Sequence, residues 1–174
     1  MPNWNFNCVT VHATPQEVGT WLVPGTETNS YLFNMHRLFP ERVPADDPTG
    51  MKAWDHDRFV QTTGSKWTPD VYMQASPDGL ETYLTYDSAW TPNNGTLQRL
   101  HELTGWAIEN EYKEEGCLIA GAFHCVDGSC SDIEREYMTS CEICEVEKPD
   151  DEYDEEAEDL ICNECRRKAK ILLP

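Results

Sequence analysis

Two C-x-x-C pairs are the strongest chemical signal in this sequence. The four cysteines are Cys141, Cys144, Cys162 and Cys165, and seventeen residues separate the two pairs. Each pair can present two thiolates from one tight turn, and two such turns complete the tetrahedral four-sulfur shell that suits zinc. The spacing therefore favours one bound zinc over disulfides or free thiols. Because a closed shell leaves no position for water or substrate, we expect a structural zinc rather than a catalytic one.

The segment between the pairs is strongly acidic and shows no apolar periodicity. Its carboxylates include Asp150, Asp151, Glu152, Asp154, Glu155 and Glu156. One interpretation is a solvated loop that keeps the protein in solution. The other is a carboxylate array that imitates phosphates and occupies a basic groove on a partner. The residues after Cys165 are basic and predict the helix of a treble-clef or zinc-ribbon module, in which the charges pair with the acidic neighbours or touch nucleic acid.

The charge of the whole chain limits its partners. The formal net charge is −19, from 13 basic and 32 acidic residues. Such a chain is repelled by nucleic-acid backbones and anionic membranes and is attracted to basic protein surfaces. The longest apolar run, residues 117–123, is too short to span a bilayer, and the first residues lack a secretion signal. We therefore predict a cytoplasmic protein with reduced cysteines.

The remaining elements predict an α+β domain over residues 1–130, followed by an acidic zinc-binding module over residues 131–174. Thr14, Pro15 and Glu17 form a capping box that starts a helix, and Gly105 ends a second helix with apolar positions at Leu97, Leu100 and Leu103. A short third helix is expected over 55–63. The expected strands are 6–13, 31–34, 71–75, 80–86, 106–112 and 117–125. Two helices on one face of an antiparallel-rich sheet fit a ferredoxin-like arrangement.

Other candidate residues have both an ordinary and a functional interpretation. Cys125 and Cys130 bracket a four-residue turn, and buried free thiols are favoured there over a second metal site. Asp55, His56 and Asp57 resemble part of a metal or acid–base site, but acidic residues are also preferred at a helix start. The tryptophans Trp4, Trp67, Trp90 and Trp106 are expected in the core, with an exposed recognition patch as the alternative. No nucleophile motif or phosphate loop occurs, so we predict that the protein is not an enzyme.

Four motifs occur in a fixed order in the first 130 residues. They are Met1–Trp4 with Asn7, Gly64–Trp67, Ser88–Pro92, and Tyr112–Gly116 with Gly121. Together they resemble the Api-type family of phage and plasmid proteins, whose members carry a ferredoxin-like domain. The resemblance implies an origin in a mobile element and that fold, and the family has no established activity. A cysteine commonly follows the first tryptophan in the family; here Asn5 stands in that place, so no role for that cysteine carries over.

These observations predict an acidic, zinc-stabilised phage or mobile-element protein that works by binding. The expected partner is a host protein with a basic surface, such as a defence protein that handles nucleic acid, and binding would inhibit it. Direct contact with nucleic acid is not expected. One alternative is a zinc-finger adaptor or transcriptional regulator that contacts nucleic acid through the basic C-terminal helix. Another is an enzyme that uses Asp55, His56 and Asp57.

Overall fold

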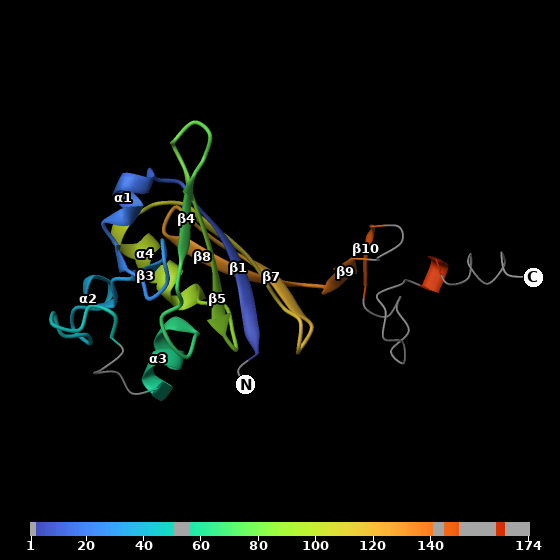
Figure 1. Ribbon diagram of the computed structural model, residues 1–174, viewed down its shortest axis with the longest axis horizontal. Coiled ribbons are helices and arrows are strands. Elements are labelled where there is room, and N and C mark those ends of the chain that lie inside the picture. The colour runs from blue at the N-terminus through green and yellow to red at the C-terminus, as the bar shows by residue number, and fades with distance from the viewer. Residues whose placement is uncertain (1–2, 51–55, 141–144, 150–162, 166–174) are drawn as a thin grey trace, which may run out of the picture. The chain divides into compact units, whose positions relative to one another are not determined.

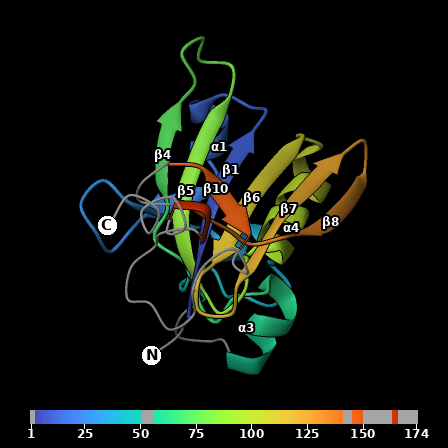
Figure 2. The same cartoon turned by 90° about the vertical axis from the view of Figure 1, so that its right-hand side faces the viewer.

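The computed structural model describes residues 3–50, 56–140, 145–149 and 163–165. The chain divides into two units, residues 1–134 and residues 135–174. The first unit is an α+β fold around a six-stranded sheet, which confirms the expected fold class (Figure 1). In sheet order the strands are β4 (Tyr72–Ala75), β5 (Thr82–Ala89), β1 (Trp4–Val11), β6 (Ile108–Glu114), β7 (Ile119–Val126) and β8 (Ser129–Arg135). Figure 2 shows the sheet with β4 at the left and β8 at the right.

The strand order of the sheet is compatible with the expected ferredoxin-like arrangement. β1 is antiparallel to both of its neighbours, and Val9 lies opposite Leu84 on β5 and Asn110 on β6. β5 and β6 therefore run parallel to each other with β1 between them, and the helix α4 (Asn94–Thr104) joins them as in a split βαβ unit. β4 likewise runs parallel to β1, with β5 between them. The connection from β1 to β4 begins with α1 (Pro15–Gly19) and includes a separate hairpin of β2 (Leu22–Pro24) and β3 (Tyr31–Phe33).

Two helix signals predicted from the sequence are confirmed, one at the start of α1 and one at the end of α4. The Thr14 hydroxyl accepts from the Glu17 N–H at 3.4 Å, and the Glu17 carboxylate accepts from the Thr14 N–H at 3.0 Å. Gly105 closes α4 (Asn94–Thr104) in the left-handed conformation with a φ of 73°. The other helices are α2 (Met35–Leu38) and α3 (His56–Thr63). The helices lie on the same side of the sheet (Figure 1).

The sheet face that meets the helices is apolar at one end and polar at the other. At the apolar end, Val9, Val11 and Leu84 are fully buried and belong to one core cluster with Leu97 and Leu100 of α4. At the polar end, the buried residues are Asn5, Asn7, Ser88 and Asn110. The Asn7 side-chain N–H donates to the Ser88 hydroxyl at 2.9 Å, and the Asn110 side-chain N–H donates to the Asn7 amide oxygen at 3.0 Å. Alternation along β1 therefore turns its even-numbered residues to the helix-free face.

The region around residue 130 departs from expectation. Cys125 on β7 and Cys130 on β8 form a disulfide, so the prediction of free thiols at these positions was wrong. The turn between the strands brings the two cysteines opposite each other, which is the geometry that a disulfide needs. β8 continues to Arg135, so residues 131–135 are part of the sheet rather than of a separate module.

The second unit contains a two-stranded antiparallel sheet. β9 (Met138–Ser140) pairs with β10 (Glu147–Pro149), and residues 163–165 are helical, with Cys165 buried. The predicted zinc ligands Cys141, Cys144 and Cys162 lie outside the described residues, as do the six acidic residues from Asp150 to Glu156 and the basic segment 166–174. None of the helices in the described part of the chain is long and apolar enough to cross a membrane.

Candidate functional site

A cleft of about 670 Å³ opens beside the sheet where β4 leaves the edge of β5. Tyr72, the first residue of β4, lies opposite Thr85, and β5 continues to Ala89 without β4 as a partner. The chain diverges because the preceding residue, Val71, pairs with Tyr31 of β3, through backbone hydrogen bonds of 2.7 and 2.8 Å. The lining residues are Trp4, Phe6, Thr26, Glu27, Leu32, Trp67, Thr68, Pro69, Asp70, Tyr72, Thr85, Tyr86 and Asp87.

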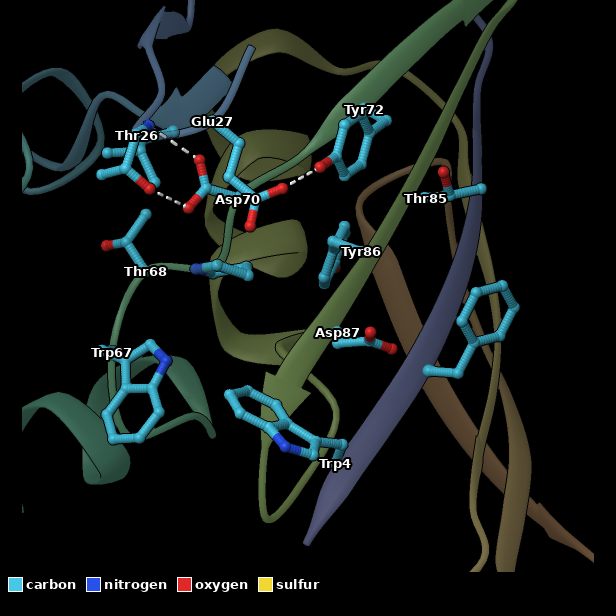
Figure 3. A pocket seen from close by; sticks show the side chains of 13 residues that line it. Trp4, Thr26, Glu27, Trp67, Thr68, Asp70, Tyr72, Thr85, Tyr86 and Asp87 are labelled. Carbon is cyan, nitrogen blue, oxygen red and sulfur yellow. Dashed lines mark hydrogen bonds between the residues drawn. The ribbon is translucent and has the colours of Figure 1, made fainter. Parts of the chain in front are cut away.

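Apart from Leu32 of β3, the lining residues form two walls (Figure 3). The strand wall comes from β1, β4 and β5 and comprises Trp4, Phe6, Tyr72, Thr85, Tyr86 and Asp87. The loop wall comes from the segments before β3 and before β4 and comprises Thr26, Glu27, Trp67, Thr68, Pro69 and Asp70. Strand register thus positions one wall, and loop hydrogen bonds position the other.

Exposed aromatic side chains line much of the cleft. Trp4 is 50% exposed and Phe6 is 42% exposed, because Asn5 and Asn7 take the buried positions of β1. The Trp67 ring stands edge-on to Trp4, with 5.9 Å between ring centroids. Contiguous exposed apolar side chains of this kind mark interaction sites on protein surfaces.

The predicted core position of two tryptophans was wrong. Trp4 is half exposed on the outer face of the sheet, and Trp90 is 45% exposed directly after β5. Trp67 and Trp106 are half-buried. Position at the end of an element does not bury a side chain; the direction in which the strand presents it does. The patch that was the alternative interpretation therefore includes Trp4, while Trp90 lies outside the cleft lining.

Asp70, on the loop wall, is held by a set of hydrogen bonds. One carboxylate oxygen accepts from the Thr26 N–H at 2.8 Å and from the Ser30 hydroxyl at 2.5 Å, and the other accepts from the Thr26 hydroxyl at 2.5 Å. Burial raises the pKa of Asp70, but the hydrogen bonds from Ser30 and Thr26 outweigh burial and bring the pKa below its ordinary value. This carboxylate is therefore ionised, and its three hydrogen bonds tie two loop segments together.

Glu27 connects the two walls. Its carboxylate accepts a hydrogen bond from the Tyr72 hydroxyl (Figure 3). This hydrogen bond, followed by burial and the negative charges of Glu27 and Asp70, raises the pKa of Tyr72. The phenol therefore stays neutral and acts as a donor. One carboxylate oxygen of Glu27 is engaged in this bond, and the other faces no donor among the described residues.

Asp87, on the strand wall, differs from Asp70 and Glu27. No described residue donates a hydrogen bond to its carboxylate, and burial raises its pKa above the ordinary value. Phe6 lies directly opposite on β1, and Trp4 is the diagonal neighbour, opposite Ala89. Asp87 is exposed along one side, yet the adjacent rings remove part of its hydration. It is a carboxylate that faces the cleft without a hydrogen-bond partner among the described residues (Figure 3).

A lysine of the chain itself lies at the rim of the aromatic cluster. The Lys66 ammonium is 4.5 Å from the Trp90 ring centroid and 5.4 Å from the Trp67 ring centroid. Trp90 has a left-handed backbone with a φ of 74°, which bulky residues seldom adopt. The two rings thus attract the Lys66 ammonium. Among the described residues, no lysine or arginine belongs to the lining itself.

The structure does not bring the sequence-predicted site residues together into one described site. Cys165 is buried, but its three predicted co-ligands lie outside the described residues. Asp57 is exposed in the first turn of α3, and Asp55 lies outside the described residues. Among the residues that the structure describes, no group of three His, Cys, Asp or Glu side chains is placed to hold a metal ion.

Sequence reasoning missed the three carboxylates of the cleft. Asp87 had a detectable signal, because it continues the outward-facing series of Tyr83 and Thr85 on β5. Glu27 and Asp70 lie in loops without periodicity, and nothing in their sequence spacing indicates that they approach the same cleft.

No protein-family model, curated protein or solved structure matches this chain. The resemblance of residues 1–130 to the Api-type family therefore rests on the sequence motifs alone, and the cleft must be interpreted from its own chemistry.

Proposed function

We propose that this protein binds a basic segment of another protein, with the cleft as its recognition surface. The observation that carries this proposal is that three carboxylates and several exposed aromatic rings line one cleft, and the described residues of its lining include no lysine or arginine. Aromatic side chains dominate the energetics of protein interfaces, and acidic groups steer a basic partner to them. The cleft volume is in the range of sites that enclose a side chain or a small ligand.

We further propose that the partner is a host protein that handles nucleic acid and that binding inhibits it. A net charge of −19 favours this class, since such proteins expose basic grooves. The acidic residues from Asp150 to Glu156 would add a second, phosphate-imitating contact. The resemblance to a phage and plasmid family is consistent with a target in the host's defence. In this proposal the acidic segment speeds association, whereas the cleft supplies the specific contact.

The second unit is proposed to depend on one zinc ion held by Cys141, Cys144, Cys162 and Cys165. In support, β9 and β10 flank the first cysteine pair in sequence, and Cys165 is buried at a helical turn. Metal binding in small modules of this kind contributes on the order of 10 kcal/mol to folding. Elemental analysis should find one zinc per chain, and a chelator should unfold residues 135–174. Protein purified without zinc and with protected amides in this unit would disprove the proposal.

The binding proposal is tested by comparing what the full-length protein and its variants capture from host lysate. The first variant combines Trp4→Ala with Asp87→Asn, and the second neutralises the six acidic residues from Asp150 to Glu156. The first variant should capture less of a host protein with a basic groove than the parent protein does. Salt should weaken the binding of that host protein to the parent. Capture that is identical for parent and first variant would refute the proposal. Capture of nucleic acid by the purified protein would favour the adaptor alternative.

A further inference from the structure

We propose that the cleft is a binding site for one arginine side chain, whose guanidinium pairs with Asp87 and stacks against Trp4 and Phe6. This inference rests on the proposed function and names the chemical group that the cleft recognises.

The first step is that the three carboxylates of the cleft are not equivalent. Asp70 already accepts three hydrogen bonds from Thr26 and Ser30, so most of its acceptor capacity is used within the protein. Glu27 uses one oxygen for Tyr72. Asp87 receives no donor from the described residues although burial already raises its pKa. A partly desolvated carboxylate without donors is unfavourable, so a ligand that brings donors to Asp87 gains the most.

The second step is the position of the rings around Asp87. Phe6 is its direct cross-strand neighbour, and such pairs have Cβ atoms about 4.5–5.5 Å apart on one face of a sheet. Trp4 is diagonal to Asp87, within reach of a large side chain, and its ring is half exposed. A planar cation can therefore lie against a ring and donate to the carboxylate at the same time. This combination of stacking and in-plane hydrogen bonding is characteristic of the guanidinium group.

The third step excludes other cations. A guanidinium has five N–H donors in a fixed fork, so it can engage both oxygens of Asp87 at once and still donate to other groups. A lysine ammonium is a compact and strongly hydrated charge that makes no bidentate pair. A trimethylated ammonium binds aromatic rings but has no donor and would leave Asp87 unpaired. The chemistry of the cleft therefore favours arginine over both.

The chain's own lysine supports this assignment. Lys66 lies over Trp90 and Trp67 at the outer rim, which shows that the cluster accommodates a cation against its rings. Lys66 is not part of the cleft lining and has no ion pair with Asp87. The inner rings and the free carboxylate thus remain open to a second cation from outside.

The test uses the full-length protein and four blocked tripeptides, acetyl-Gly-X-Gly-amide, in which X is arginine, lysine, trimethyllysine or citrulline. Citrulline is the matched control, since it keeps the planar shape of arginine but is neutral. Binding is followed by the NMR shifts of the tryptophan side-chain N–H groups and the backbone N–H of Asp87. The arginine peptide should bind about tenfold or more tightly than each of the others, a difference of about 1.4 kcal/mol.

Variants locate the site. Asp87→Asn and Trp4→Ala should each weaken binding of the arginine peptide about tenfold, and both replace exposed side chains, so the fold should survive. Asp127→Asn is the charge control, because Asp127 lies in the turn between β7 and β8, at the opposite edge of the sheet from β4. Its left-handed φ of 50° is one that asparagine tolerates. This variant should bind like the parent, and thermal unfolding checks that all three are folded.

Several results would overturn the inference. Equal affinity for arginine and citrulline would show that charge pairing plays no role. Tightest binding of trimethyllysine would identify an aromatic cage that does not use Asp87. Undiminished binding by Asp87→Asn would remove the proposed partner. Failure of the inference also differs from failure of the proposed function: protein capture that depends on Asp87 without arginine selectivity contradicts only the inference, whereas arginine selectivity without dependence of capture on the cleft contradicts only the function.

Discussion

Each wall of the cleft carries an aspartate, and the pKa values of the two aspartates are shifted in opposite directions. On the loop wall, Asp70 accepts hydrogen bonds from Thr26 and Ser30, and its pKa lies below the ordinary value. On the strand wall, Asp87 has no donor among the described residues, and burial raises its pKa. The comparison shows that hydrogen bonding, more than exposure, separates a carboxylate that stabilises the fold from one that remains available to a ligand.

The difference follows from the backbone on which each residue sits. Irregular loops leave N–H and hydroxyl groups free to turn toward a side chain, and Asp70 collects them from the segment before β3. β5 is a regular strand whose backbone pairs with β1 along its whole length. A side chain that stands perpendicular to such a sheet has few backbone donors within reach. Asp87 therefore faces the cleft with its oxygens open.

The largest effect is expected from Asp70→Ala. Removing the charged acceptor leaves the donors of Thr26 and Ser30 without their partner, so the free energy of unfolding should fall by about 2 kcal/mol at pH 7. Urea unfolding, monitored by tryptophan fluorescence, measures this change. Asp87→Ala is the matched control and should cost far less. Equal losses in the two variants would mean that the walls do not differ in the way described.

A smaller effect of opposite sign is expected from Asp87→Asn. Because its pKa is raised in the folded protein, the ionised carboxylate opposes folding at neutral pH, and a neutral amide removes that penalty. The free energy of unfolding should rise, although by well under 1 kcal/mol because solvent screens an exposed group. The same urea unfolding experiment measures this change in the free energy of unfolding. A clear loss of stability would reveal a donor to Asp87 and weaken the case for an open carboxylate.

The smallest expected effect concerns the pH dependence of these differences in the free energy of unfolding. Unfolded aspartate has a pKa of about 3.9. The gap between parent and Asp87→Asn should close as pH falls from the raised pKa of Asp87 to that value, because both chains are then neutral at the site. The stability that Asp70 contributes is present above about pH 3.9 and is lost only as pH falls further, through its lowered pKa. Unfolding curves between pH 3 and pH 7 should therefore separate the two transitions, and coincident ones would contradict the assignment.

Features encoded over a few residues could be predicted from the sequence. The capping box of Thr14 and Glu17 and the C-cap at Gly105 depend on local geometry, and both are confirmed. Alternation in β5 correctly places Thr82, Leu84 and Tyr86 on the buried face. The membership of each strand in the main sheet was harder to predict, because β3 pairs with β2 in a separate hairpin and β8 extends the main sheet beyond residue 130.

The candidate site was less predictable than the fold. The zinc motif was visible because its ligands share a characteristic spacing, whereas the cleft assembles Trp4, Asp70 and Asp87 from segments with no common pattern. The exposure of Trp4 follows from Asn5 and Asn7 being buried, and polar residues are rarely assigned to a core from sequence alone. The disulfide between Cys125 and Cys130 depends on the tight turn between β7 and β8.

The buried asparagines of the sheet have a consequence for how the chain reaches its native alignment. A slip of β1 by one residue would turn Asn7 and Val9 to the outer face and bring Phe6 inside. A slip by two residues would keep the faces but move Asn7 away from Ser88 and Asn110, leaving amide groups buried without partners. A purely aliphatic strand would tolerate that second error far better. The buried amides therefore favour the native strand register over slipped ones, and the native register keeps Trp4 and Phe6 next to Asp87.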